Sequence, residues 1–297
     1  MNIRPWLATG ACAAALALAV GSGTAASATA VQHAARAAAP GTVRVKGLHK
    51  VSNVQLPHTA LPRTRNLHNT LYSTNWSGYT AIAKKGVQIR FISANFNVPS
   101  INCANSPDGT AGAAVSHWVG LDGLGSVPDG TSGTVEQAGV TAYCTSTTGT
   151  PTYYAWYEMY PADPVTYTGI SPGDALNVSV YFNPSTHVYN LVLDDLSTNA
   201  GFNADATCAS GCLNSSAEVI SEVPSSSAGT VTLADYGAEN YTGASVTARD
   251  GVKGNLSASS LWTSQELVML DSSGTVMSQP SSLEGGQAFN IQWKNAS

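Results

Sequence analysis

The feature that most restricts the fold is a series of short runs in which apolar and polar residues alternate, separated by clusters of Gly, Pro, Asn, Asp and Ser. Alternation with a period of two is typical of β-strands with one buried face, and the clusters are typical of turns. No long amphipathic helix competes with this pattern. The runs lie at 87–98, 176–182, 188–193, 231–233, 267–270 and 289–293. We therefore predict an all-β protein, an antiparallel β-sandwich of two packed sheets of the lectin-like or jelly-roll type.

The first 30 residues have the pattern of a secretory signal peptide. Arg4 precedes an apolar run at about 11–20, and small residues with the cleavage-type patterns Ala26-Ser27-Ala28 and Ala28-Thr29-Ala30 follow. The run is too short to span a bilayer comfortably, and no later segment is apolar enough to do so. We predict a signal peptide at 1–30 and a secreted, extracellular protein.

Residues 31–70 are a basic segment whose charge differs from that of the chain that follows. We predict that this segment is a leader. Seven Lys or Arg and no acids precede residue 71, whereas six Lys or Arg and all eighteen Asp and Glu follow it, so the body carries a net charge of −12. The leader is either a disordered linker or a propeptide, and opposite charge favours a propeptide that docks on the body. Residues 71–297 then form one β-sandwich domain. Only 10% of the chain is charged and there is no basic excess, which argues against a nucleic-acid-binding surface.

Cysteine usage predicts disulfides rather than a metal site. Four cysteines remain after the signal peptide, an even number that suggests two bridges in an exported chain: Cys103, Cys144, Cys208 and Cys212. Three pairings exist, and the short spacing of the last two favours a local loop that leaves the first two together. Zinc is the alternative, but neither His117 nor His187 has ligand spacing to a cysteine pair. We expect no metal and no cofactor, since phosphate loops and dinucleotide glycine patterns are also absent.

Two segments place carboxylates beside apolar residues. In the strand predicted at 155–161, alternation puts Trp156, Glu158 and Tyr160 on one face, which suits a cleft better than a core. In the segment 217–222, an ideal strand puts Glu218 and Glu222 on one face with an apolar neighbour that raises a carboxyl pKa. Spacing alone nevertheless favours a solvated edge strand with surface acids for 217–222. Because no Gly-x-Ser-x-Gly occurs and the body has two histidines, what remains is carboxylate and amide chemistry.

Five motifs, in order, resemble the glutamic peptidases, the eqolisin family of secreted acid endopeptidases. The resemblance covers about 72–293 and is carried by Asn75-Trp76-Ser77-Gly78, Trp118-Val119-Gly120-Leu121-Asp122-Gly123, Gln137-Ala138-Gly139-Val140, Trp156-Tyr157-Glu158-Met159-Tyr160-Pro161 and Ala217-Glu218-Val219-Ile220-Ser221-Glu222. It implies a sandwich of two antiparallel sheets. It also implies a catalytic dyad of Gln137 and Glu222, with Glu218 as the nearest competitor for the second role.

The resemblance further implies a substrate cleft and a set of partners. The matching cleft residues are Trp76, Trp118, Asp122, Trp156, Glu158 and Tyr160, and 160–169 would be a flap-like loop over the substrate. Four positions differ from the residues common in the family: Thr141, Tyr154, Met159 and the pair Val223-Pro224. Expected partners are protein or peptide substrates and the chain's own propeptide, in a monomer that uses neither nucleic acid nor membrane.

The implied reaction is peptide hydrolysis by an activated water. Glu222 would take a proton from water and return it to the leaving nitrogen, while Gln137 would donate its amide N–H to the developing oxyanion. Two other classes stay open. One is a secreted β-sandwich glycoside hydrolase that uses Glu158 and Glu222, and the other is a non-catalytic carbohydrate-binding module with the tryptophans as a sugar platform.

Overall fold

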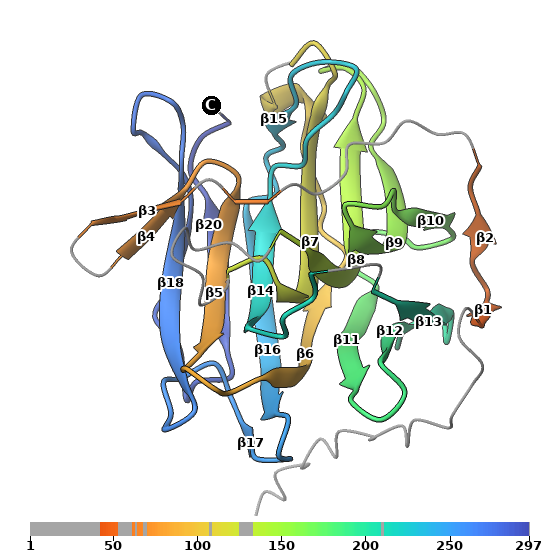
Figure 1. Cartoon of the computed structure of the whole chain (residues 1–297). Helices are drawn as coiled ribbons and strands as arrows, with labels where there is room; N and C mark the ends of the chain where they lie inside the picture. Colours follow the sequence, from red (N-terminus) through yellow and green to blue (C-terminus); the bar gives the residue numbers. More distant parts are fainter. Residues whose placement is uncertain are drawn as a thin grey trace, which may run out of the picture. The chain divides into compact units, whose positions relative to one another are not determined.

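The computed structural model describes residues 42–52, 61–62, 64–67, 70–106, 109–124, 133–208 and 211–296. Apart from one 3-10 turn at Cys103–Asn105, the regular secondary structure of these residues is all β-strand. The prediction of an all-β, antiparallel protein is confirmed (Figure 1). The signal peptide predicted at 1–30 lies outside the described residues. Within the described part of the chain, no helix is both long and apolar enough to cross a membrane.

The first layer, here layer A, is an antiparallel sheet with the strand order β17–β16–β6–β11–β12–β13–β1. Its strands are β17 (Lys253–Gly254), β16 (Ala238–Ala248), β6 (Ile89–Asn97), β11 (Ala175–Asn183), β12 (Val188–Asp195), β13 (Gly201–Thr207) and β1 (Val43–Lys46). Burial alternates along β11, where Leu176, Val178 and Val180 are buried and the residues between them are less so. The sequence pattern predicted this strand because a period of two fits one covered face.

The second layer, here layer B, has the strand order β3–β4–β18–β5–β14–β7–β8–β9–β10–β2. Its strands are β3 (Thr64–Leu67), β4 (Thr70–Ser73), β18 (Trp262–Leu270), β5 (Trp76–Ala83), β14 (Ser216–Glu222), β7 (Ala113–Asp122), β8 (Val135–Cys144), β9 (Thr152–Tyr160), β10 (Val165–Thr168) and β2 (His49–Lys50). Three further strands join it, β15 (Thr232–Leu233), β19 (Val276–Pro280) and β20 (Phe289–Trp293). Only the pairs β15–β7 and β18–β4 are parallel among the described strands.

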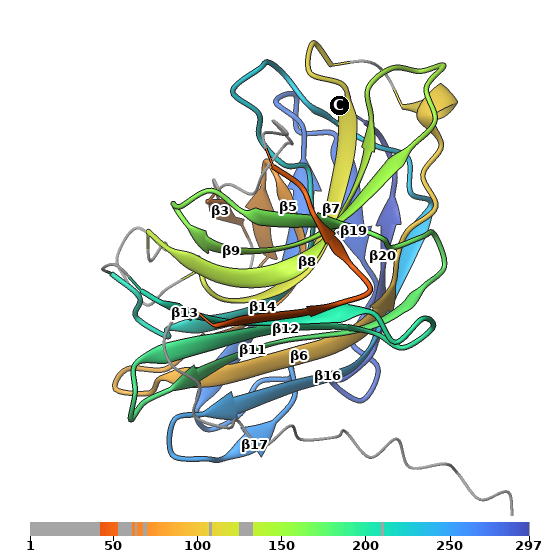
Figure 2. The ribbon, with the colours of Figure 1, turned by 90° about the vertical axis from the view of Figure 1, so that its right-hand side faces the viewer.

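The main apolar core lies between the layers, which Figure 2 shows nearly edge-on with β8 and β9 above β11 and β12. Strand β14 contributes Ala217 and Val219 to this core. Its other face is also covered, because Ile220 belongs to a second cluster that contains three tryptophans. All seven residues of β14 are buried between β5 and β7. The expectation of a solvated edge strand at 217–222 is therefore wrong, since local spacing does not reveal neighbours on both sides and both faces.

Both disulfides follow the pairing that spacing favours. Cys103 bonds Cys144 across 41 residues, and Cys208 bonds Cys212.

The segment expected to be a flap at 160–169 is mostly a hairpin instead. Val165–Thr168 forms β10, which pairs antiparallel with β9 and buries Tyr167 against the core. A strand that pairs with β9 and β2 therefore occupies most of the second half of the segment expected to be a loop.

Candidate active site

One face of the middle strands of layer B carries the predicted site residues in three rows. Residues opposite one another on β5, β14, β7, β8 and β9 make up each row. The outer rows are Thr80, Glu218, Gly120, Gln137, Glu158 and Trp76, Glu222, Ser116, Thr141, Tyr154. The middle row is Gly78, Ile220, Trp118, Gly139, Trp156. Because the rows are two residues apart along each strand, their side chains point to the same face.

Three tryptophans form an apolar cluster on this face. Trp76 and Trp118 meet edge to face, with ring centroids 4.7 Å apart and planes at 77°. Trp156 and Ile220 belong to the same cluster, and Tyr160 packs against it. The three indole side chains are at most 4% exposed. The structure thus brings together four of the six residues predicted to line a cleft.

Glu222 is fixed at the edge of this cluster by two N–H donors. The indole Nε1 of Trp118 donates to its Oε2 at 2.9 Å, and the side-chain amide of Asn75 donates to its Oε1 at 3.3 Å. Glu222 itself is fully buried. Asn75 belongs to the first of the five motifs but had no predicted role. It directly precedes Trp76, which lies opposite Glu222 in the sheet.

Gln137 is held by Glu158 on the neighbouring strand. Its amide Nε2 donates to Glu158 Oε2 at 2.8 Å, and both side chains are buried. A side-chain amide has two N–H groups, so a glutamine in this position can serve Glu158 and one further acceptor. The hydrogen bond fixes which end of the amide carries the donors.

The indole of Trp118 extends from Glu222 toward Gln137. Its Nε1 bonds Glu222, while its Cζ3 lies 3.0 Å from where a Cβ on Gly120 would stand. The Cβ of Gln137 lies 3.1 Å from the same point. A side chain at Gly120 would therefore press on the Trp118 ring and on the Cβ of Gln137. The glycine lets both residues border the same space.

Thr141 connects Trp156 to the row that contains Glu222. The indole Nε1 of Trp156 donates to Thr141 Oγ1 at 2.8 Å, and Thr141 Oγ1 lies 2.7 Å from Ser116 Oγ. Ser116 is opposite Glu222 in the sheet. Thr141 and Ser116 thus form a neutral hydroxyl pair that orients one tryptophan.

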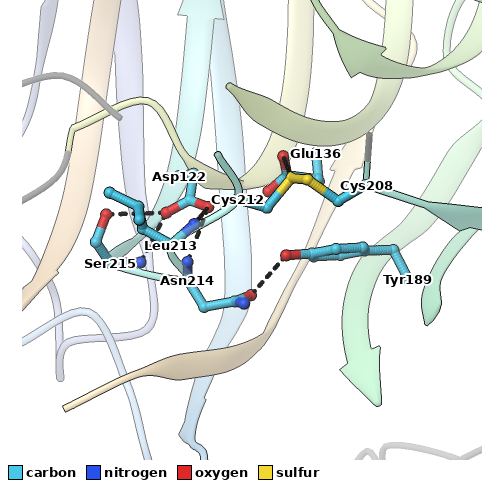
Figure 3. The surroundings of a disulfide bond; sticks show 8 residues. All are labelled: Asp122, Glu136, Tyr189, Cys208, Cys212, Leu213, Asn214 and Ser215. Carbon is cyan, nitrogen blue, oxygen red and sulfur yellow. Dashed lines mark hydrogen bonds between the residues drawn. A yellow bond between two sulfur atoms is a disulfide. The ribbon is translucent and has the colours of Figure 1, made fainter. Parts of the chain in front are cut away.

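Asp122 is bound to the loop at 213–215. Its carboxylate accepts the backbone N–H groups of residues 213–215 at 2.7–2.8 Å and the hydroxyl of Ser215 at 2.9 Å (Figure 3). Asp122 has a φ of 69°, which turns the end of β7 toward that loop. Its contacts are those of a residue that holds the loop after the Cys208–Cys212 disulfide.

Glu136 is a buried carboxyl that sequence reasoning missed. Burial, and then the nearby charge of Asp122, raise the pKa of Glu136 well above its usual range. Its Oε1 lies 2.9 Å from Cys212 Sγ (Figure 3). A disulfide sulfur has no hydrogen to donate, so the contact fits a protonated Glu136. The cluster of Glu136 with Cys208 and Cys212 is compact enough for a metal ion, but bridged sulfurs are not thiolate ligands.

Glu218, the competitor of Glu222, has different surroundings. Thr80 donates its hydroxyl to Glu218 Oε1 at 3.2 Å, and no tryptophan N–H is among its described hydrogen bonds. Complete burial raises the pKa of Glu218 well above its usual range, and the charge of Asp122 adds to that effect. In the sheet Glu218 lies in the same row as Gly120 and Gln137, two residues along β14 from Ile220 of the tryptophan cluster.

His117 points to the opposite face of layer B, into the core between the layers. Its Nδ1 lies 2.7 Å from Ser221 Oγ and 2.9 Å from Tyr241 Oη. Its Nε2 has no hydrogen-bond partner among the described residues. Burial lowers the pKa of His117 to about 3. His117 is therefore a neutral packing residue and no part of the site.

Comparisons with known proteins give a family match and two relatives. The model of the peptidase A4 family matches residues 74–293. Scytalidopepsin B of Scytalidium lignicola is 35% identical over 120 residues, or 40% of this chain and 39% of that protein. Aspergillopepsin-2 of Aspergillus niger is 29% identical over 199 residues, or 60% of this chain and 66% of that protein. The matches thus span less than two thirds of the length of either relative.

Solved structures extend the similarity to the fold. Scytalido-glutamic peptidase, solved with a peptide-based transition state analogue, is 26% identical with a TM-score of 0.57, covering 74% of this chain and 98% of that one. Aspergilloglutamic peptidase from Aspergillus niger is 25% identical with a TM-score of 0.50, covering 61% and 99%.

Proposed function

The chain belongs to the peptidase A4 family, and from this premise we propose that it is a secreted acid endopeptidase with Gln137 and Glu222 as its catalytic dyad. The observation that carries the proposal is the arrangement around Trp118. One end of its indole donates to the Glu222 carboxylate, and its Cζ3 borders the space above Gly120 that the Cβ of Gln137 also borders. An amide donor and a carboxylate on one face of a sheet are the two groups that hydrolysis without a nucleophilic side chain needs.

The proposed reaction proceeds by attack of water. Glu222, ionised, accepts a proton from a water molecule as its oxygen adds to the carbonyl carbon of the peptide. Gln137 donates an amide N–H to the oxygen that becomes negative, and a placed donor of this kind contributes a few kcal/mol, about 3, to the transition state. Glu222 then gives its proton to the amide nitrogen as the C–N bond breaks. An amide does not titrate in acid, so Gln137 keeps its role at low pH.

Three neighbours would position the dyad. Glu158 holds the Gln137 amide through a 2.8 Å hydrogen bond, and Asn75 and Trp118 hold the Glu222 carboxyl. These are positioning residues in the proposal. The tryptophan cluster would provide apolar walls for an extended peptide and keep bulk water from the oxyanion.

The test is hydrolysis of a denatured protein at acidic pH in the presence of pepstatin, with matched variants of two buried glutamates. Glu222→Gln should abolish cleavage, whereas Glu218→Gln, the same change on the same strand and face, should retain it. Gln137→Ala should lower kcat by about 10²–10³, the usual effect of losing an oxyanion donor. Circular dichroism of each variant shows whether it is folded.

Each rival function gives a different result in this assay. Full activity in Glu222→Gln, or its loss only in Glu218→Gln, would refute the assignment of the dyad. Release of sugar from a polysaccharide without protein cleavage would favour a glycosidase. A folded protein that cleaves neither substrate and binds sugar would favour a carbohydrate-binding module.

The proposal includes export and a removable leader. The two disulfides suit an oxidising compartment. In the full chain both Gln137 and Glu222 are completely buried, so a peptide can reach them only after a covering segment moves. Leu61, within the basic leader, packs against the tryptophan cluster and contributes to that cover. Removal of the leader would then open the cleft.

A further inference from the structure

Part of the basic leader is built into both layers of the body. Strand β1 pairs with β13 of layer A over four residues, from Val43 opposite Ala204 to Lys46 opposite Gly201. Strand β2 then pairs with β10 of layer B, with His49 opposite Thr168 and Lys50 opposite Tyr167. Figure 1 shows β1 and β2 along one side of the molecule, next to β13 and β10.

Backbone hydrogen bonds extend both pairings beyond the strands. The N–H of Asp205 donates to the carbonyl of Thr42 at 2.9 Å, and the N–H of Val51 donates to the carbonyl of Thr166 at 2.9 Å. Apart from the leader, β13 and β10 have a strand on one side only among the described pairings. The leader thus covers an otherwise open edge in each layer, and open edges are the places where sheets accept another strand.

The chain crosses from one layer to the other at Gly47 and Leu48. Gly47 has a φ of 69°, and a Cβ there would lie 2.8 Å from the Cβ of Ala200, so the turn needs glycine on both counts. Leu48 is only 7% exposed and belongs to the main core between the layers. The other side chains of β1 and β2 are exposed. One leucine therefore anchors this segment, while the backbone supplies the rest of its attachment.

From these contacts the geometry points to residues 43–50 as a clamp that joins the two layers and is the segment by which the leader docks on the body. The occupied surface consists of the edges of β13 and β10 with the Leu48 pocket between them. The segment that occupies this surface is residues 43–50 of the same chain, an extended stretch with Leu48 between two short strands. Basic residues at Arg44, Lys46 and Lys50 suit the acidic body. The inference that release of the clamp activates an enzyme rests on the proposed function. The attachment of residues 43–50 to both layers does not depend on that function.

The test compares two leader substitutions in the full chain with Glu222→Gln, so that the leader stays attached. Leu48→Ser removes the buried anchor, and Val45→Ser makes a similar change at a residue that is 42% exposed. Hydrogen–deuterium exchange in β13 and β10 should become about tenfold faster or more in Leu48→Ser. The reason is that burial of a leucine side chain stabilises the docked segment by at least the free energy that corresponds to a tenfold change in exchange rate. Exchange in β14 should stay unchanged, and Val45→Ser should match the parent chain.

Equal protection of β13 and β10 in Leu48→Ser and in the parent would overturn the clamp. A cross-link keeps the proposal testable if Leu48→Ser does not fold. Arg44 and Asn203 are opposite each other in the sheet, so the pair Arg44→Cys with Asn203→Cys should oxidise to a disulfide. The pair Val45→Cys with Asn203→Cys puts the thiols on opposite faces and should not. Equal cross-linking of both pairs would contradict the register.

The same leader substitutions separate the clamp from the proposed activity. In the chain with Glu222 intact, Leu48→Ser should shorten the time to peptide cleavage in acid, and Val45→Ser should not. Faster exchange at both edges with no cleavage in either variant would support the clamp and count against the peptidase.

Discussion

Replacing His117 should change how stability depends on pH, and the size of the change follows from burial. His117 is wholly buried, and its charged form would need partners for two N–H groups, whereas Nε2 has none among the described residues. Its pKa is lowered to about 3 in the folded protein, against about 6.5 in an unfolded chain. Between these values the unfolded state binds the proton and the folded state does not. The free energy of unfolding therefore falls as pH decreases from 6.5 to 3.

The magnitude is set by the 3.5-unit difference between the two pKa values. At about 1.4 kcal/mol per unit, His117 costs the folded state on the order of 5 kcal/mol at pH 3 relative to neutral pH. His117→Asn keeps a polar atom near Ser221 and Tyr241 but removes the titration. The variant should be less stable than the parent near pH 6.5, by about 1–3 kcal/mol for lost packing. This deficit should shrink or reverse toward pH 3.

Urea unfolding at pH 3.5, 5 and 6.5 measures the effect, with Glu222→Gln in every chain to prevent self-cleavage. His187→Asn is the matched control, because His187 is exposed and its φ of 57° is one that asparagine accepts. Its stability should follow the parent at each pH. A constant difference between His117→Asn and the parent across the range would refute the reasoning.

Three further predictions follow from buried groups. Glu136 has a raised pKa in the folded state, so its stabilising effect is present below about pH 4.5 and is lost as pH rises; Glu136→Gln should raise the melting temperature at pH 7 more than at pH 4. Thr141→Val removes the acceptor of the Trp156 indole and should lower kcat/KM about tenfold, while Thr141→Ser should retain activity. Replacing Cys103 and Cys144 together by Ser should lower the free energy of unfolding by about 4 kcal/mol in urea, because the bridge closes a loop of 41 residues. Unchanged values in any of these would contradict the corresponding contact.

The proposed site shows where local patterns stop being informative. Alternation placed Glu218, Ile220 and Glu222 on one face of a strand, and the register of β14 agrees. The same pattern favoured an exposed edge strand, whereas β14 is buried between β5 and β7. Period-two spacing reports the direction of a side chain and carries no information on what covers it. Only neighbouring strands distinguish Glu222, bonded by Trp118, from Glu218, bonded by Thr80.

The attachment of the leader also could not be predicted in detail from the sequence. Its charge contrast with the body predicted docking, but charge is long-ranged and does not specify an edge or a register. The structure attaches residues 43–50 by backbone pairing with β13 and β10 and by the single buried Leu48. Asp122 differs likewise from its predicted place, because a positive φ turns it toward the loop at 213–215.

The sequence by itself determined the strand-rich architecture, the pairing of the disulfides by spacing and the motifs that mark the family. These properties depend on residue type and on separations along the chain, which a sequence contains in full. Tertiary structure decided which carboxyl accepts an indole N–H, which one lies against a disulfide, and how the leader joins two layers. Those contacts arise between residues up to about 160 positions apart, such as Val43 and Ala204. Register and sheet curvature bring them together, and neither property is local to any segment.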